Sequence, residues 1–165
     1  MLGNCIARVA GLTLLCALSA CASNDPPVLL EVSDASTRFV WPVDHVSRIV
    51  NSGYGDRGGR GKSSDFHRGI DIAAPRGAPV LAVAPGMVTV AGSGNGYGHY
   101  IVIDHGNGFG TLYAHLLDFA VRTGDRVQAR QRIGSVGKSG NATGYHLHFE
   151  VHRSGKTADP LLYLP

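Results

Sequence analysis

The chain has 165 residues, enough for one domain, with 44% hydrophobic residues, 23 glycines and only 16% charged residues. Heavy use of glycine with few charges favours short strands joined by tight turns over long charged helices. The formal net charge of +3 points to no particular partner, and the lack of a Lys/Arg run argues against nucleic-acid binding.

The first twenty residues have the pattern of a signal peptide. Arg8 supplies the positive start, and Val9 to Ala20 form an apolar stretch that is too short to span a membrane. Leu18-Ser-Ala-Cys21 resembles a bacterial lipobox, so we expect cleavage before Cys21 and acyl chains on that cysteine, anchoring the protein to a membrane. Ala22 after the cysteine favours the outer membrane, facing the periplasm. The alternative is an ordinary secretory signal with a coincidental cysteine.

The segment after the leader predicts a tether. Residues 21–38 contain Ser, Asn, Asp and a Pro26-Pro27 pair with little periodicity, and a domain then begins at residue 39 and continues to 165. No cysteine follows Cys21, so this domain has no disulfide, no cysteine nucleophile and no thiolate metal site.

Strand-like runs recur at short intervals through the domain, separated by segments that carry the Gly, Asn or Pro required by turns. The predicted strands are Gly69–Ala73, Pro79–Ala84, Met87–Ala91, Tyr100–Asp104, Gly110–His115, Gln131–Val136 and His146–His152. We therefore predict an all-β, mostly antiparallel, sandwich-like domain whose loops wall a groove.

Two histidine motifs suit a zinc site. His146 and His148 share one face of a predicted strand, with Leu147 facing the core. His67 and Asp71 would also share a face if their strand extends back that far. Two imidazoles and a carboxylate can hold zinc and leave a position for water, as in catalytic sites. Either motif alone is weak, because histidines are usually surface or hydrogen-bonded residues, and no His-Glu-x-x-His helix is present.

Several motifs, in the right order from about Val40 to Leu164, resemble the lysostaphin-type, LytM-like zinc metallopeptidases of peptidase family M23. The matching segments are Phe66-His-Arg-Gly-Ile-Asp-Ile-Ala-Ala-Pro75, Gly86-Met-Val88, Ile103-Asp-His-Gly-Asn-Gly108, Thr111-Leu-Tyr-Ala-His115 and Gly144-Tyr-His-Leu-His-Phe-Glu-Val151.

The resemblance implies a role for each motif residue. His67, Asp71 and His148 would be the ligands of one zinc ion per chain. His115 and His146 would line the site without binding metal and act as general base and as donor to the oxyanion. The other histidines are interpreted modestly: His105 as a turn residue or a residue behind the site, His99 at the rim of the groove, and His45 and His152 at the surface.

The function implied by this resemblance is a zinc endopeptidase that cuts peptide cross-links of peptidoglycan. The bond would be D-Ala–meso-diaminopimelate in a Gram-negative envelope and glycyl–glycine otherwise. Two alternatives stay open: a non-catalytic activator that binds a cell-wall amidase, and a wall-binding module that does not cut. Because all five motif positions are intact, the enzyme is favoured over the activator.

Overall fold

The computed structural model describes residues 39–43, 48–56 and 66–165, all within one unit, Asp34–Pro165. The predicted signal peptide, the lipidation site at Cys21 and the tether lie outside the described residues, as does the loop 57–65 before His67. Within the described ranges, no helix has the length and apolarity needed to cross a bilayer.

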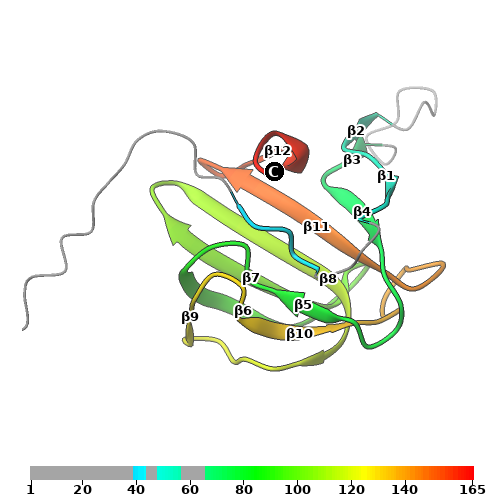
Figure 1. The fold of residues 1–165 in the computed structure, drawn as a ribbon, viewed down its shortest axis with the longest axis horizontal. Coiled ribbons are helices and arrows are strands. Elements are labelled where there is room, and N and C mark those ends of the chain that lie inside the picture. Colours follow the sequence, from blue (N-terminus) through cyan, green and yellow to red (C-terminus); the bar gives the residue numbers. More distant parts are fainter. Residues whose placement is uncertain (1–38, 44–47, 57–65) are drawn as a thin grey trace, which may run out of the picture. The chain divides into compact units, whose positions relative to one another are not determined.

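Four antiparallel strands form the centre of the main sheet (Figure 1). They are β6 (Gly86–Gly94), β7 (Gly98–Gly106), β8 (Phe109–Phe119) and β11 (His146–Arg153). The β7–β8 turn is formed by Asn107 and Gly108, whose φ angles of 51° and 77° are the left-handed values that a tight hairpin turn requires. β11 pairs with β8 on one side and with β4 (Ile70–Ala73) on the other, and β1 (Val50–Ser52) lies beyond β4.

Shorter strands extend the ends of these long ones. β5 (Pro79–Leu81) pairs with β10 (Arg132–Val136), which also pairs with the end of β8. β9 (Arg126–Val127) pairs with β6, and β12 (Lys156–Ala158) pairs with the end of β11. β2 (Gly55–Asp56) and β3 (Phe66–His67) form a separate two-stranded sheet. A 3₁₀ turn, η2 (Pro160–Leu162), follows Asp159, whose side chain accepts a hydrogen bond from the Leu161 N–H.

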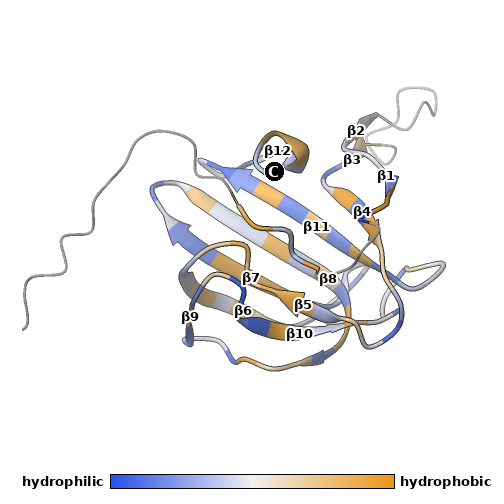
Figure 2. Ribbon diagram, in the orientation of Figure 1, coloured by the Kyte–Doolittle hydropathy of each residue, from blue (hydrophilic) through white to orange (hydrophobic). Residues whose placement is uncertain are grey.

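Strand β11 has one apolar face and one polar face, seen as alternating colours in Figure 2. Leu147, Phe149 and Val151 are fully buried and join the core. Burying a side chain of this size contributes about 1.5–3 kcal/mol. The other face carries His146, His148, Glu150 and His152. The core beneath is built mainly from Val80, Val88, Ile101, Ile103, Tyr113, Leu116, Ile133 and Val136.

The prediction of an all-β, mostly antiparallel domain is confirmed. Each of the seven predicted runs overlaps a strand of the structure. The strands that the sequence did not predict are β1, β2, β3, β9 and β12. Each has only two or three residues, too few to show an alternation of apolar and polar side chains.

Candidate metal centre and catalytic histidines

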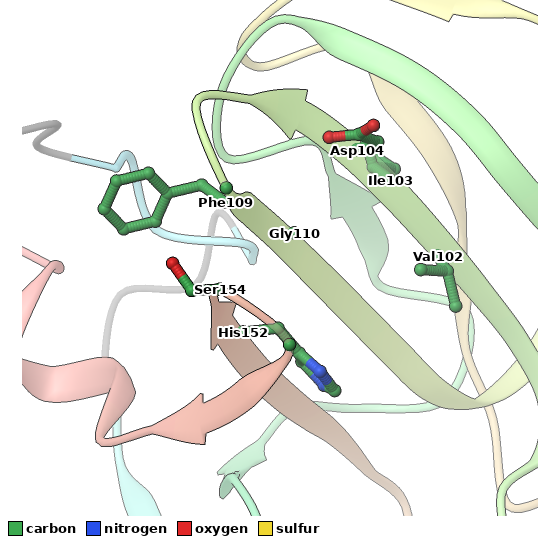
Figure 3. A pocket seen from close by; sticks show the side chains of 9 residues that line it. Val102, Ile103, Asp104, Phe109, Gly110, His152 and Ser154 are labelled. Atoms are coloured by element: carbon green, nitrogen blue, oxygen red, sulfur yellow. The ribbon is translucent and has the colours of Figure 1, made fainter.

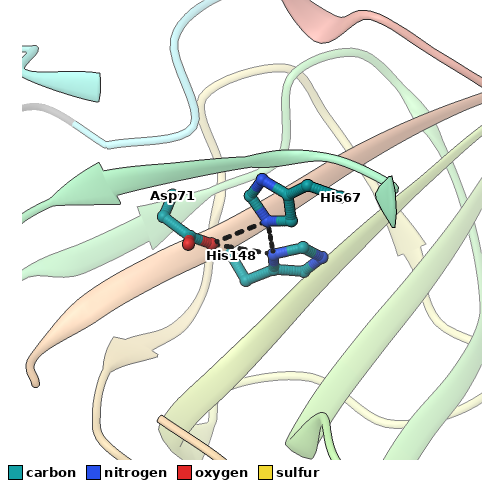
Figure 4. Close-up of side chains that lie close together, drawn as sticks. All are labelled: His67, Asp71 and His148. Atoms are coloured by element: carbon teal, nitrogen blue, oxygen red, sulfur yellow. Dashed lines mark hydrogen bonds and ion pairs between the residues drawn. The ribbon is translucent and has the colours of Figure 1, made fainter. Parts of the chain in front are cut away.

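The pairing of β4 with β11 brings two of the predicted ligands together. Asp71 lies directly opposite His148 in the register, and the Asp71 Oδ1 atom is 2.9 Å from His148 Nδ1. His67 Nε2 is 3.2 Å from the same oxygen and 3.1 Å from His148 Nδ1 (Figure 4). One ligand atom from each residue lies within 4.8 Å of the others. Two imidazole nitrogens and a carboxylate oxygen thus converge, which is a donor set suited to zinc.

His67 reaches this cluster in a different way from the one the sequence suggested. β4 does not extend back to His67, which lies instead in β3 and pairs with Gly55. The chain bends at Gly69, where an added Cβ would lie 2.2 Å from the Phe149 carbonyl oxygen. Because the backbone passes β11 this closely, only glycine fits at the bend. His67 is buried, and its ring points toward Asp71 and His148 (Figure 4).

Each histidine of the cluster has its second ring nitrogen bound to an acceptor. His67 Nδ1 lies 2.6 Å from the Gly53 carbonyl oxygen, which can only accept, so Nδ1 carries the proton. His148 Nε2 lies 3.0 Å from Glu150 Oε1 and donates to that carboxylate. These bonds hold a proton on His67 Nδ1 and on His148 Nε2, so His67 Nε2 and His148 Nδ1 are the two ring nitrogens that face the cluster. His148 Nδ1 donates to Asp71 here, and it would bind a metal after giving up that proton.

Glu150 is a buried carboxylate that the sequence reasoning missed. It is 1% exposed and accepts three hydrogen bonds, from His148, from Tyr97 Oη at 2.6 Å and from His152 Nε2 at 2.7 Å. Burial alone would raise the pKa of Glu150, but these bonds outweigh it and lower the pKa to about 2. Burial, together with the hydrogen bond to Glu150 and the charge of that carboxylate, raises the pKa of Tyr97 to about 12. Glu150 is thus ionised and Tyr97 un-ionised at neutral pH.

Two of these contacts correct or extend the sequence interpretation. The assignment of His152 to the surface is only half right, because its ring is about one-third exposed but bonds to a buried carboxylate. Glu150 could have been predicted, since alternation along the strand places it on the same face as His146 and His148. Tyr97 lies in a glycine-rich loop, and nothing in the sequence connects it with β11.

The electrostatics of the cluster favour a charged carboxylate. Burial would raise the pKa of Asp71, but the hydrogen bond from His148 and the nearby His67 lower it to about 2. Burial would lower the pKa of His148, but its bonds to Asp71 and Glu150 outweigh burial and raise it. The ionised Asp71 offers the anionic ligand that a divalent cation needs beside two imidazoles.

His115 and His146 lie beside the cluster. Their ring centroids are 4.9 Å apart, and the His115 ring is 5.8 Å from that of His148. His146 Nδ1 is 3.0 Å from the Gly144 carbonyl oxygen, and His115 Nδ1 is 2.8 Å from the Ser139 carbonyl oxygen. In each ring, therefore, Nδ1 donates and Nε2 is left for other partners. Burial lowers the pKa of His115, which favours its neutral form.

A break in strand β8 turns His115 toward the cluster. Ala114 is paired with His148, so regular alternation would point His115 to the opposite side. His115 instead has a φ of 60°, a left-handed value that non-glycine residues rarely adopt, and the register of β8 with β7 shifts at this point. Strain of this kind costs on the order of 1–3 kcal/mol and is found mostly at functional sites.

Two grooves lie near opposite ends of the polar face of β11. One, of about 360 Å³, is lined by Arg76, His99, Leu116, Leu117, Lys138, Ser139 and Tyr145. The predicted placement of His99 at a groove rim agrees with this lining. The other, of about 270 Å³, is mostly apolar and is lined by Val102, Phe109, His152, Ser154 and their neighbours (Figure 3).

Comparison with known proteins identifies relatives of this chain. Residues 65–160 match the model of peptidase family M23. Over 96 residues, 58% of the chain, the protein is 46% identical to the DD-carboxypeptidase/endopeptidase Mpg of Neisseria meningitidis, of which the match covers 22%. Over 106 residues, 64% of the chain, it is 40% identical to the murein hydrolase activator NlpD of Escherichia coli, of which the match covers 28%. The chain thus spans less than a third of the length of these two relatives.

The fold also matches a solved structure. A zinc-containing peptidase from Vibrio cholerae superposes with a TM-score of 0.68 at 35% sequence identity. The match covers 74% of this chain and 39% of that one.

Proposed function

The chain belongs to peptidase family M23, and on this basis we propose that it is a zinc-dependent endopeptidase that hydrolyses peptide cross-links of bacterial peptidoglycan. The observation that carries the proposal is the convergence of His67 Nε2, Asp71 Oδ1 and His148 Nδ1, with two further imidazoles beside them. We assign these three residues as the ligands of one zinc ion. A zinc ion held there would lower the pKa of an attacking water toward neutrality and polarise the scissile carbonyl.

His115 and His146 are proposed to move protons and stabilise charge. Because a backbone carbonyl accepts from each Nδ1–H, Nε2 is the atom of each ring that would exchange a proton, and His146 Nε2 lies 3.6 Å from Asp71 Oδ1, beside the proposed zinc. A neutral ring can accept a proton at Nε2, and the imidazolium formed is steadied by its carbonyl partner and can return the proton to the leaving amine. A ring that donates an N–H stabilises the developing oxyanion. We assign the two roles, proton acceptor and donor to the oxyanion, to His115 and His146 as a pair.

Glu150 keeps His148 in the tautomer that this arrangement needs. Its carboxylate accepts the His148 Nε2–H, and Tyr97 and His152 hold the carboxylate in turn. The Glu150 side chain is buried behind the histidine and does not contact substrate, so its role is to position His148.

We propose D-Ala–meso-diaminopimelate as the bond in a Gram-negative envelope. The likeness to an endopeptidase of Neisseria supports wall peptides as substrates. The lipobox pattern at Cys21 supports anchoring of the chain to the outer membrane, facing the periplasm, with the tether 21–38 carrying the peptidase domain.

The alternative function is activation of a cell-wall amidase, which the similarity to the activator NlpD favours. The two functions differ in what they require of the histidines. An activator acts by contact and keeps its effect when His115 is replaced, whereas the enzyme loses turnover.

The test is mass spectrometry of muropeptides after incubating the protein with purified, cross-linked peptidoglycan. A His115→Ala variant and a chelator-treated sample serve as controls. We expect the wild type alone to convert cross-linked dimers to monomers, and the masses identify the bond. Unchanged muropeptides in every sample, together with stimulation of an amidase by the His115→Ala variant, would favour the activator.

A further inference from the structure

The groove lined by Arg76, Lys138 and Tyr145 lies next to the proposed catalytic histidines. Ser139 lines it, and the Ser139 carbonyl oxygen accepts the hydrogen bond from His115 Nδ1. Ser139 Oγ also donates to the carbonyl oxygen of Leu116, another lining residue. Tyr145 comes immediately before His146. The groove therefore lies next to the two histidines that are proposed to act on the scissile bond.

The charge of this groove is one-sided. Arg76 and Lys138 are both exposed, and no acidic side chain lines the groove with them. Neither cation forms an ion pair with any residue of the described ranges. Arg132, also exposed, has by contrast a carboxylate partner, since its Nη2 atom lies 3.6 Å from Asp118 Oδ1. Two uncompensated cations at the wall of a concave site favour an anionic ligand.

His99, another residue that lines the groove, carries a buried polar atom. Its Nδ1 atom is buried, and within the described part of the chain it has no hydrogen-bond partner. The ring is held by Phe119, 5.3 Å away, and the backbone N–H by Ser139 Oγ at 2.9 Å. Buried polar atoms without partners are rare, and a bound ligand or water is the usual explanation.

We propose that this groove is a subsite that binds a carboxylate of the substrate peptide, one or two residues from the scissile bond. The proposal rests on the proposed endopeptidase function and adds the substrate class, a peptide with a free carboxylate at that position. An extended peptide advances about 3.3–3.6 Å per residue, and the carbonyl oxygen of Ser139, a lining residue, accepts from the His115 ring, so the carboxylate of a residue near the scissile bond can reach this groove. Arg76 and Lys138 supply the charge, and the half-exposed face of Tyr145 packs on the peptide.

The experiment uses two synthetic cross-linked wall peptides that differ in one group, a free carboxylate or the corresponding carboxamide. The R76Q/K138Q double variant is compared with wild type. The matched control is R126Q/K156Q, which removes the same charge from two exposed residues that do not line the groove. Cleavage assays give KM and kcat for each combination of protein and peptide. Calorimetry gives the dissociation constant of each peptide.

For the carboxylate peptide, we expect R76Q/K138Q to raise KM by about tenfold, the usual effect of losing a charge-assisted hydrogen bond, with kcat changed less than twofold. The carboxamide peptide should show the raised KM already with wild type, and no further rise with the variant. R126Q/K156Q should behave as wild type. An equal rise in KM for both peptides with R76Q/K138Q would overturn the subsite. So would an equal rise in KM with the control variant R126Q/K156Q.

The two proposals fail in different ways. If wild type cuts both peptides with the same KM, the endopeptidase function stands and the carboxylate subsite is wrong. If wild type cuts neither peptide but binds the carboxylate form more tightly, and R76Q/K138Q abolishes that preference, the subsite stands and the catalytic function is wrong.

Discussion

The two ends of the polar face of β11 carry the same residue types and yet differ in what they can bind. His148 and His152 both donate to the carboxylate of Glu150, one from each side. The His148 ring is buried against Asp71 and His67, whereas the His152 ring is about one-third exposed beside an apolar groove (Figure 3).

The difference comes from the neighbouring strands. β4 pairs with β11 at residues 146–149 and places Asp71 opposite His148. At the other end β12 takes that position and places Thr157 opposite His152. A histidine beside a buried carboxylate is therefore not enough for the proposed metal centre, which also needs the carboxylate of Asp71 on β4 and the imidazole of His67 on β3.

The largest expected effect follows directly from this difference between the two ends. His148→Ala should lose stoichiometric zinc, because it removes one of three converging ligands, while His152→Ala should keep it. Metal content after dialysis, measured by atomic emission, checks both. His146→Ala serves as a further control and should largely retain zinc. Zinc lost from His152→Ala but kept by His148→Ala would reverse the assignment of the two ends.

The next effect separates zinc binding from turnover at the cluster end. His115→Asn should lower kcat by about 10²–10⁴ and leave zinc content unchanged, because the role proposed for the ring is to move a proton or donate to the oxyanion without binding metal. Asn is chosen because it tolerates the left-handed φ of 60° better than Ala does. Loss of zinc from a folded His115→Asn protein would place His115 among the ligands.

Glu150 joins the two ends, so its replacement measures how far they are coupled. Glu150→Gln should weaken zinc binding by about 10–100-fold, as changes behind a metal ligand usually do. Competition with a chromophoric chelator gives the affinity, and circular dichroism confirms folding. Zinc affinity equal to wild type in a folded variant would mean that Tyr97 and His152 have no influence on the cluster through this carboxylate.

The smallest effect concerns a histidine outside the polar face of β11. His105 donates from Nδ1 to the Pro85 carbonyl oxygen, and burial lowers its pKa below the ordinary 6.5 despite that bond. The unfolded chain therefore binds a proton at His105 first, and the free energy of unfolding falls as pH drops from about 6.5 toward the lowered pKa.

His105→Gln removes this contribution, so its free energy of unfolding should decline less steeply than that of wild type below pH 6.5. The difference in slope is at most about 1.4 kcal/mol per pH unit. Urea denaturation at a series of pH values measures it, and above pH 7 the two curves should run parallel. Parallel curves throughout would show that His105 has the same pKa in both states.

Much of this molecule could be predicted from the sequence where the signal is local. The alternation of Leu147 and Phe149 with His146 and His148 predicted both the strand and its two faces. The positions of Glu150 and Asp71 relative to each other depend on which strands pair, and pairing between distant segments leaves no local pattern. The left-handed φ of His115 leaves no local pattern in the sequence either. The bend at Gly69 was not predictable because the need for glycine comes from Phe149 across the sheet and not from adjacent residues.

One further consequence follows from two glycines that lie against each other. Gly98 and Gly140 both have positive φ, and an added Cβ on either would come within 2.4 Å of backbone atoms of the other loop. Hydrogen bonds tie the same loops together, from the Asn141 N–H to Gly96 and from the His99 N–H to Ser139. The loops before β7 and after β10 should therefore open as one cooperative unit, so their amide protons exchange with solvent together. His115 is hydrogen-bonded to both loops, to Tyr97 and to Ser139, so the position of its ring depends on both loops staying closed.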